Sequence, residues 1–215
     1  MSLKLYYHPL SSFCQKALVA LYENDTPFTP VFIDLGNEAS KAQLLKIWPI
    51  GKFPVLEDLS RNRVVPESSI IIEYLAQYYP GRSTLVPADP DLARENRARD
   101  RFFDLDIQVP MQKIVSDRWR PADKKDPFGV ERAQASLRVA LDLLEGEMTG
   151  KTWAMGEEFS MADCAAAPAL YYANFLEPFT DRHAKVASYF ARLLARPSFA
   201  RAVKEAEPYR HLLPQ

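Results

Sequence analysis

The chain has 215 residues, 47% of them apolar and 26% charged, and its 27 basic and 28 acidic side chains leave a net charge of -1. That balance supplies no electrostatic field to hold a polyanion or an anionic bilayer, so we expect neither nucleic acid nor a membrane as a partner. Two cysteines make no disulfide framework, and the N-terminus has no basic segment leading into an apolar run, so the expected location is the cytoplasm.

The first 80 or so residues alternate short strand and helix patterns in the order βαβ, then ββα. The helical segments carry apolar residues at helical spacing, and the last one ends at Pro80-Gly81. Strands are expected at residues 3–7, 30–34, 54–57 and 63–65, and helices at residues 11–24, 41–47 and 67–79.

After Gly81 the strand pattern disappears. Residues 82–90 (RSTLVPADP) contain two prolines and are typical of a linker. Helices are expected at residues 91–119, with a bend at Pro110, and at residues 130–148, 160–176, 183–195 and 197–207. The fold class is therefore a small α/β domain at residues 1–81, a linker at 82–90 and an all-helical domain at 91–215.

The loop YHPLSSFC, residues 7–14, connects the first strand to the first helix. Ser11 and Ser12 lie at the helix start, where free backbone N–H groups and the positive end of the helix dipole favour an anion. A serine at such a position is more often only the helix cap. Cys14 falls one turn inside the helix, where cysteine is more often a small buried apolar residue than a reactive thiolate.

Two further segments place proline or polar residues at element boundaries. In WPIGKFPVL, residues 48–56, Pro54 opens a strand, where it is either a sheet-edge residue or part of a cis peptide bond. In PESSIIIEY, residues 66–74, Glu67 and Ser68 begin a helix directly after a strand. A carboxylate and a hydroxyl there cap the helix or grip the ammonium and carboxylate of a ligand.

Together, and in this order, the three segments resemble the cytosolic glutathione transferase superfamily. The resemblance covers nearly the whole chain: FSMADCAAAP, residues 159–168, is similar to the family's SxAD helix start, and ARPSFARAV, residues 195–203, to its closing RPS helix. Ser11 resembles the catalytic serine of the serine-type classes, theta and zeta. The resemblance implies a thioredoxin-like first domain, and a function in which glutathione attacks an apolar electrophile bound between the two domains.

The resemblance implies that Ser11 holds the glutathione sulfur as a thiolate, with Ser12, Tyr6 and Cys14 as alternatives for that contact. A thiol of pKa about 8.5 must lose about two units to be mostly ionised at neutral pH, roughly 2.7 kcal/mol. One hydrogen bond to a charged acceptor supplies about 1.5–3 kcal/mol and a helix N-terminus roughly 0.3–2. Glutathione is then the co-substrate, and neither a metal nor a general base is required.

The resemblance also implies how the rest of glutathione binds. Pro54 would be the family's cis-proline, which turns the backbone of Phe53 outward so that the tripeptide docks like an added strand. Glu67 and Ser68 would hold the γ-glutamyl end. Lys52 would lie near the glutathione backbone and reach toward the glycyl carboxylate.

The sequence departs from the family's pattern between the two glutathione-binding segments. Trp48 stands where the family commonly has asparagine before proline, and the preceding residues lack the histidine or glutamine that theta-like enzymes use for the glycyl end. Lys41 or Gln43 would substitute there.

The partners implied are glutathione, a small apolar electrophile and a second copy of the chain, through residues 70–78 and the arginine-rich residues 94–101. One alternative is a peroxidase, isomerase or dehalogenase that uses the same thiolate. Another is a non-catalytic binding or stress-response module of the same architecture. The combination of Ser11, Pro54, Glu67 and Ser68 favours an enzyme, because a module has no physical need for all four.

Overall fold

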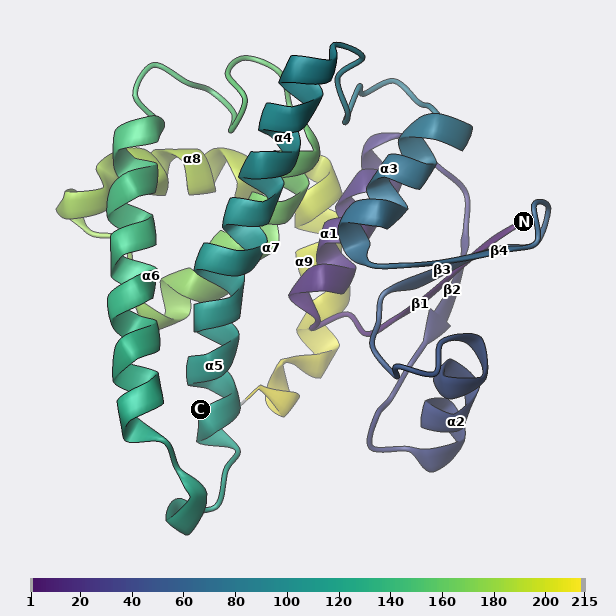
Figure 1. Ribbon diagram of the computed structural model, residues 1–215, viewed down its shortest axis with the longest axis horizontal. Helices are drawn as coiled ribbons and strands as arrows, with labels where there is room; N and C mark the ends of the chain where they lie inside the picture. Colours follow the sequence, from purple (N-terminus) through teal and green to yellow (C-terminus); the bar gives the residue numbers. More distant parts are fainter. Residues whose placement is uncertain (1, 214–215) are drawn as a thin grey trace.

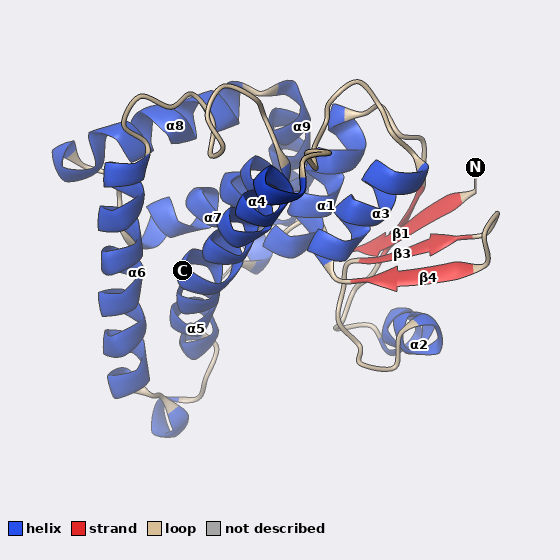
Figure 2. Cartoon of the chain, turned by 45° about the horizontal axis from the view of Figure 1, so that its top comes forward, coloured by secondary structure: helices blue, strands red, loops and turns tan. Residues whose placement is uncertain are grey.

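A four-stranded sheet with helices on both faces forms the first domain of the computed structural model, which describes residues 2–213. Figure 2 shows α1 and α3 on one face of this sheet and α2 on the other. The strand order is β2-β1-β3-β4, with β1 and β2 parallel and the other pairs antiparallel. The bounds are β1 Leu3–Tyr7, α1 Ser12–Glu23, β2 Thr29–Phe32, α2 Glu38–Ile47, β3 Val55–Asp58, β4 Arg63–Pro66 and α3 Ser68–Tyr78.

Helix α1 lies between the two domains (Figure 1). It packs against α3 on the side of the sheet and against α7 and α9 of the helical domain. Its central run Ala17–Leu21 is almost completely buried. A helix that is apolar all round must be covered all round, and this helix therefore joins the two domains into one core.

The second domain is helical, as the sequence predicts. Its helices are α4 Pro90–Phe102, α5 Val109–Arg118, α6 Pro127–Glu147, α7 Met161–Leu176, α8 Ala184–Ala195 and α9 Pro197–Ala206. Three short 3-10 segments, which the pattern does not reveal, lie at Ala122–Lys124, Asp181–His183 and Glu207–Leu212. The last of these follows α9 directly, so helical structure continues beyond residue 207, where the last predicted helix ends. None of the helices within residues 2–213 has both the length and the apolar content that crossing a bilayer requires.

The expected bend in the helix at residues 91–119 takes another form. Residues Phe103–Gln108 make a π-helical turn between α4 and α5, and Pro110 lies in the first turn of α5. Proline has no N–H to offer the carbonyl four residues before it, so the regular ladder is interrupted there. The irregularity therefore precedes the proline, and it includes a buried aspartate, Asp104.

A buried ion cluster connects α1 to this irregular turn. The ammonium of Lys16, whose side chain is only 1% exposed, lies 2.6 Å from Asp100 Oδ1 and 2.7 Å from Asp104 Oδ2. It also donates to Ser69 Oγ of α3 at 2.7 Å. Arg101 contacts the same carboxylates from the solvent side. A charge is tolerated at such depth only when paired, so this cluster orients α1, α3 and α4 relative to one another.

Asp58 stabilises the end of the sheet where β3 ends and β4 begins. Its buried carboxylate accepts hydrogen bonds from the hydroxyls of Tyr79 at 2.5 Å, Tyr74 at 2.8 Å and Ser60 at 2.7 Å, and from the backbone N–H groups of Ser60 and Arg61. Burial by itself would raise the pKa of Asp58, but the bonds from Tyr79, Ser60 and Tyr74 outweigh it and lower the pKa to about 2.

Replacing Asp58 with asparagine is expected to lower the free energy of unfolding at pH 7 by about 2 kcal/mol, because a depressed carboxyl pKa is itself a contribution to stability. That contribution is complete above the ordinary pKa of 3.8 and is lost as the pH falls toward 2. Urea unfolding at pH 7 and pH 3 measures it. The difference in free energy of unfolding between the parent and Asp58→Asn must be smaller at pH 3 than at pH 7. A difference that is the same at both pH values contradicts the assignment.

Candidate functional site

Three loops meet at one end of the sheet. In the strand register Tyr6 lies beside Val55, and Val55 lies beside Pro66. The end of β1, the start of β3 and the end of β4 therefore share one edge. Since α1 follows β1, α3 follows β4, and Phe53 and Pro54 precede β3, both helix N-termini and the proline loop lie at this edge.

Ser11 is the N-cap of α1. Its backbone is extended, with φ -73° and ψ 120°, and its Oγ accepts a hydrogen bond from the N–H of Cys14 at 3.3 Å. The capping interpretation of Ser11 is thus correct, and it does not exclude a second role. A serine hydroxyl that accepts one bond still has its own hydrogen to donate. The side chain is half-buried, whereas that of Ser12 is buried, with 7% exposed.

Tyr6 faces away from Ser11. Its ring packs with Leu44 of α2 and Val55 in the small cluster on the α2 face of the sheet, opposite to α1. Its hydroxyl donates to Glu57 Oε2 at 2.9 Å. Burial, followed by that bond to Glu57, raises the pKa of Tyr6 to about 12. Tyr6 therefore has no hydroxyl to offer a ligand at the Ser11 edge.

Both cysteines are completely buried. Burial raises the pKa of the Cys14 thiol to about 12 and raises that of Cys164 well above its usual range. Since the thiolate is the reactive form, neither side chain is expected to react in the native protein.

Thiol labelling checks this directly. Ellman's reagent at pH 8 is expected to modify neither Cys14 nor Cys164 until urea unfolds the chain, after which both react. Glutathione disulfide added to the native protein should likewise leave no mixed disulfide. A rapidly reacting thiol in the native protein would contradict this assignment.

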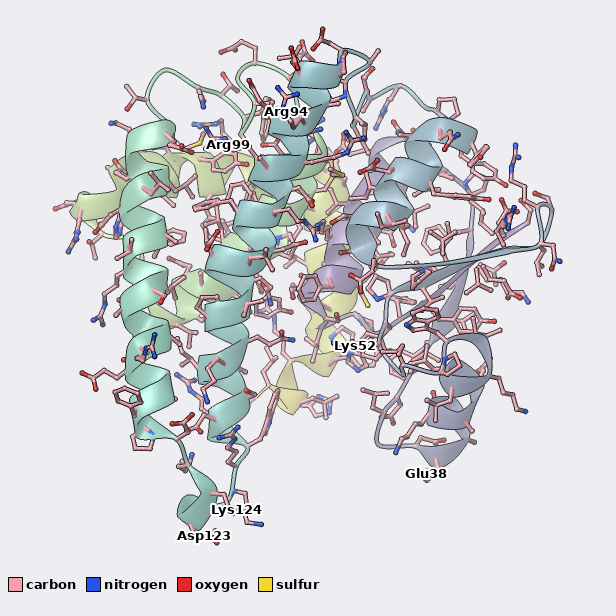
Figure 3. All side chains as sticks on the ribbon, viewed as in Figure 1. Glu38, Lys52, Arg94, Arg99, Asp123 and Lys124 are labelled. Atoms are coloured by element: carbon pink, nitrogen blue, oxygen red, sulfur yellow. The ribbon has the colours of Figure 1, made fainter. Side chains whose placement is uncertain are left out.

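The Phe53–Pro54 peptide bond is cis, as the resemblance implies. Phe53 is half-buried and lies just before β3. Neither of its backbone polar groups has a hydrogen-bond partner within residues 2–213. Lys52, labelled in Figure 3, is exposed beside it. An unpaired backbone N–H and C=O beside an exposed cation can receive a peptide and its carboxylate.

The start of α3 combines unusual backbone geometry with open donors. Glu67 has φ 71° and ψ 121°, a conformation that non-glycine residues rarely adopt, and its exposed side chain caps none of the helix N–H groups. Ser68 is buried, with 3% exposed. An uncapped helix N-terminus attracts a carboxylate, and strained backbone concentrates at binding sites. The side-chain carboxylate of Glu67 therefore remains available to pair with a cationic group of the same ligand.

An aromatic cluster, not anticipated from the sequence, borders the Ser11 loop. His8 contacts Phe32 at a ring-centroid distance of 5.2 Å, Phe53 at 6.3 Å and Tyr209 at 5.6 Å. Tyr209 also stacks on Phe32 at 5.2 Å. Burial lowers the pKa of His8, and Asp34 opposes that shift. Because Tyr209 belongs to the 3-10 segment after α9, the end of the helical domain reaches the edge where the three loops meet.

The remaining expectations concern α2 and metals. Lys41 and Gln43 are both exposed on α2, and Lys41 lies 3.9 Å from Glu38 of the same helix. Their use by a glycyl carboxylate stays a prediction. Among the described residues there is no group of three or more histidine, cysteine or acidic side chains arranged to hold a metal ion.

Two family models match the chain. The model described as glutathione S-transferase, N-terminal domain, matches residues 5–83, and that described as glutathione S-transferase, C-terminal domain, matches residues 107–197. A stringent starvation protein A homolog from Haemophilus influenzae is 31% identical over 205 residues, which cover 91% of this chain and 87% of the relative. Glutathione S-transferase hmp2 from Hypomyces subiculosus is 25% identical and covers 96% of this chain and 100% of the relative.

Solved structures with the same fold include one with a bound glutathione derivative. A glutathione S-transferase from Methylobacterium radiotolerans in complex with glutathione sulfonate has a TM-score of 0.81 and 28% identity, covering 94% of both chains. One from Methylobacillus flagellatus with glutathione bound has a TM-score of 0.85 and 24% identity, covering 94% of this chain and 98% of that one.

Proposed function

Since the chain belongs to the cytosolic glutathione S-transferase superfamily, we propose that it is a serine-type glutathione transferase, which activates the glutathione thiol for attack on an apolar electrophile. One observation carries the proposal. The hydroxyl of Ser11, the unpaired backbone of Phe53 and the uncapped start of α3 share one end of the sheet. These groups match the thiol, the peptide backbone and the γ-glutamyl carboxylate of one tripeptide.

Each end of glutathione is met by a group of suitable charge. The first-turn N–H groups of α3, beginning at Ser68, receive the γ-glutamyl carboxylate, and the Glu67 carboxylate receives its ammonium. The cysteinyl unit pairs with the backbone of Phe53 in the manner of an added strand. Lys52 is exposed and available to the glycyl carboxylate, in keeping with a near-neutral protein that binds a small anion.

The reaction needs little more than a stabilised thiolate. The thiol proton leaves to solvent, and the Ser11 hydroxyl donates to the sulfur anion at the N-terminus of α1. The bond from Cys14 N–H to Ser11 Oγ polarises that hydroxyl and makes it a better donor. The sulfur then forms a bond to an electrophilic carbon, and a leaving group departs with its electron pair or, in an addition, the adjacent atom takes up a proton.

A second candidate function is a non-catalytic binding or stress-response module that has the glutathione transferase fold but does not conjugate glutathione to a substrate. It is favoured by the relatives named stringent starvation protein A homologs, which match as much of the chain as the transferases do. Peroxidase, isomerase and dehalogenase activities remain variants of the first proposal, because they use the same thiolate on a different electrophile.

A homodimer through α3 and α4 belongs to the same proposal. Ile70 is 52% exposed and Tyr78 38% exposed on α3, and Arg97 of α4 forms a two-pronged ion pair with Glu73 of α3. Ile70, Glu73 and Arg97 border a shared groove. Light scattering on a gel-filtration column should give twice the 24.5 kDa chain mass, and Ile70→Glu should reduce it to the monomer.

Binding and conjugation assays separate the two functions. Calorimetry with glutathione and with S-methylglutathione measures binding, and chlorodinitrobenzene measures conjugation. A transferase binds both ligands and conjugates with glutathione. Binding without conjugation across a panel of aryl halides, epoxides, enones and peroxides supports the module. Absence of binding to either ligand contradicts the transferase and supports a module that does not use glutathione.

A further inference from the structure

The peptide unit between Pro9 and Leu10 is held at both of its polar ends. The carbonyl oxygen of Pro9 accepts a hydrogen bond from Nε2 of Gln15 at 2.8 Å. The N–H of Leu10 donates to Nδ1 of His8 at 3.2 Å. This unit lies in the loop that leads from β1 into α1, one peptide before Ser11.

The next peptide unit, between Leu10 and Ser11, is held in the same way. Its carbonyl oxygen accepts a hydrogen bond from the hydroxyl of Tyr172 at 2.7 Å, and its N–H donates to the carbonyl oxygen of His8 at 3.0 Å. With both ends bonded, the plane of this peptide has little freedom to rotate. The plane sets the direction in which the Cα–Cβ bond of Ser11 points.

Tyr172 comes from the other domain. It lies on α7, which packs along α1, and its side chain is buried, with 8% exposed. Its hydroxyl lies 3.3 Å from Nε2 of the fully buried Gln15, so the hydroxyl accepts from Gln15 and donates to Leu10. Burial raises the pKa of Tyr172, so the phenol keeps the proton that this bond requires.

We propose that Tyr172 is a positioning residue for Ser11, and that Gln15 orients the Tyr172 hydroxyl for this task. Through this contact the helical domain sets the placement of a donor in the α/β domain. The inference rests on the proposed function, because it matters for catalysis only if Ser11 contacts the glutathione sulfur. Tyr172 itself does not touch the substrate in this assignment. It acts through the Leu10–Ser11 peptide.

A cysteine reporter tests the positioning without glutathione. In the full-length Ser11→Cys protein the introduced thiol lies at the N-terminus of α1 and is expected to have a pKa below the ordinary 8.5. Cys14 and Cys164 are buried, so alkylation by iodoacetamide reports this thiol alone. Adding Tyr172→Phe should raise the pKa by about half a unit or more, read from the pH dependence of the alkylation rate. Adding Gln15→Met should produce a smaller rise.

Tyr189→Phe is the matched control. It also removes one buried tyrosine hydroxyl from the helical domain, here a donor to Asp163 Oδ1 at 2.6 Å, and it should lower stability without moving the reporter pKa. A Tyr172→Phe protein whose reporter pKa moves no more than that of Tyr189→Phe overturns the inference. The inference is also overturned if the reporter pKa shifts in both variants in proportion to their loss of stability.

A second comparison links the positioning to the proposed function. With Ser11 present, Tyr172→Phe should raise the pKa of bound glutathione, measured by its thiolate absorbance, and lower kcat more than it changes KM for glutathione. In the Ser11→Ala background the same change should have no further effect on that pKa. If Ser11→Ala alone leaves the pKa of bound glutathione unchanged, the proposed function fails. If Ser11→Ala raises that pKa and Tyr172→Phe does not, only the positioning inference fails.

Discussion

Replacing Ser11 with alanine is expected to raise the pKa of bound glutathione by about one to two units and to lower kcat/KM at neutral pH by roughly 10- to 150-fold. One hydrogen bond to a charged acceptor is worth about 1.5–3 kcal/mol, and each 1.36 kcal/mol corresponds to a factor of ten. Affinity for glutathione should change little, because Phe53, Glu67 and Ser68 hold the rest of the tripeptide. Absorbance titration of the bound thiolate and steady-state kinetics measure the two effects.

The controls for this prediction are the neighbouring alternatives. Ser12→Ala, Tyr6→Phe and Cys14→Ala each remove a group near the same loop. Tyr6 donates to Glu57 and Cys14 is fully buried, so we expect these variants to keep the thiolate absorbance of bound glutathione. The serine-type assignment is wrong if one of them abolishes the absorbance while Ser11→Ala preserves it.

Replacing Lys16 with methionine is expected to lower the free energy of unfolding at pH 8 by about 3 to 5 kcal/mol. The change keeps most of the side-chain volume but removes the cation between Asp100 and Asp104, which are 1% and 6% exposed. Within residues 2–213, two buried carboxylates are then left with only the half-exposed Arg101 as a counter-ion. Urea unfolding of both proteins measures the loss.

The pH dependence and a matched variant identify the cause. Burial raises the pKa of Asp104, and the Lys16 ammonium opposes that shift. Without the ammonium the folded-state pKa rises further above the unfolded value, so the variant regains stability as the pH falls from 8 toward 5. Lys16→Met combined with Asp104→Asn should recover part of the loss at pH 8. Lys204→Met, an exposed lysine on α9, should stay within about 0.5 kcal/mol of the parent.

Hydrophobic periodicity was sufficient to predict the main elements of this fold. Residues 3–7 coincide with β1, and the predicted helix at residues 160–176 differs from α7 only in its first residue, Ser160. Such patterns are local, because an element displays its period wherever it packs. The helix predicted at residues 91–119 is the exception. Its proline predicted a bend, but the π-helical turn falls before it, at residues that contact Lys16 of α1.

The same distinction between local patterns and long-range contacts applies to the candidate site. Ser11 and Ser68 could be placed at helix starts from the sequence, because serine next to an apolar helical run is a local signal. The positive φ of Glu67 has no such signal, since glycine or asparagine would be expected at that conformation. The position of His8 in the loop after β1 gives no such signal either. Its contacts with Phe53 and Tyr209 depend on where the chain ends in space.

The balanced charge, the order of strands and helices, and the residue types at the three loop positions were determined by the sequence alone, since each is a property of neighbouring residues. Only the tertiary structure decided which groups remain open to a ligand. Tyr6 is excluded because β1 directs its ring toward α2. The peptide before Ser11 is held from α7 by Tyr172, which lies 162 positions after Leu10 and bonds its carbonyl oxygen. Contacts across such separations depend on how the two domains pack around α1, and no local pattern records them.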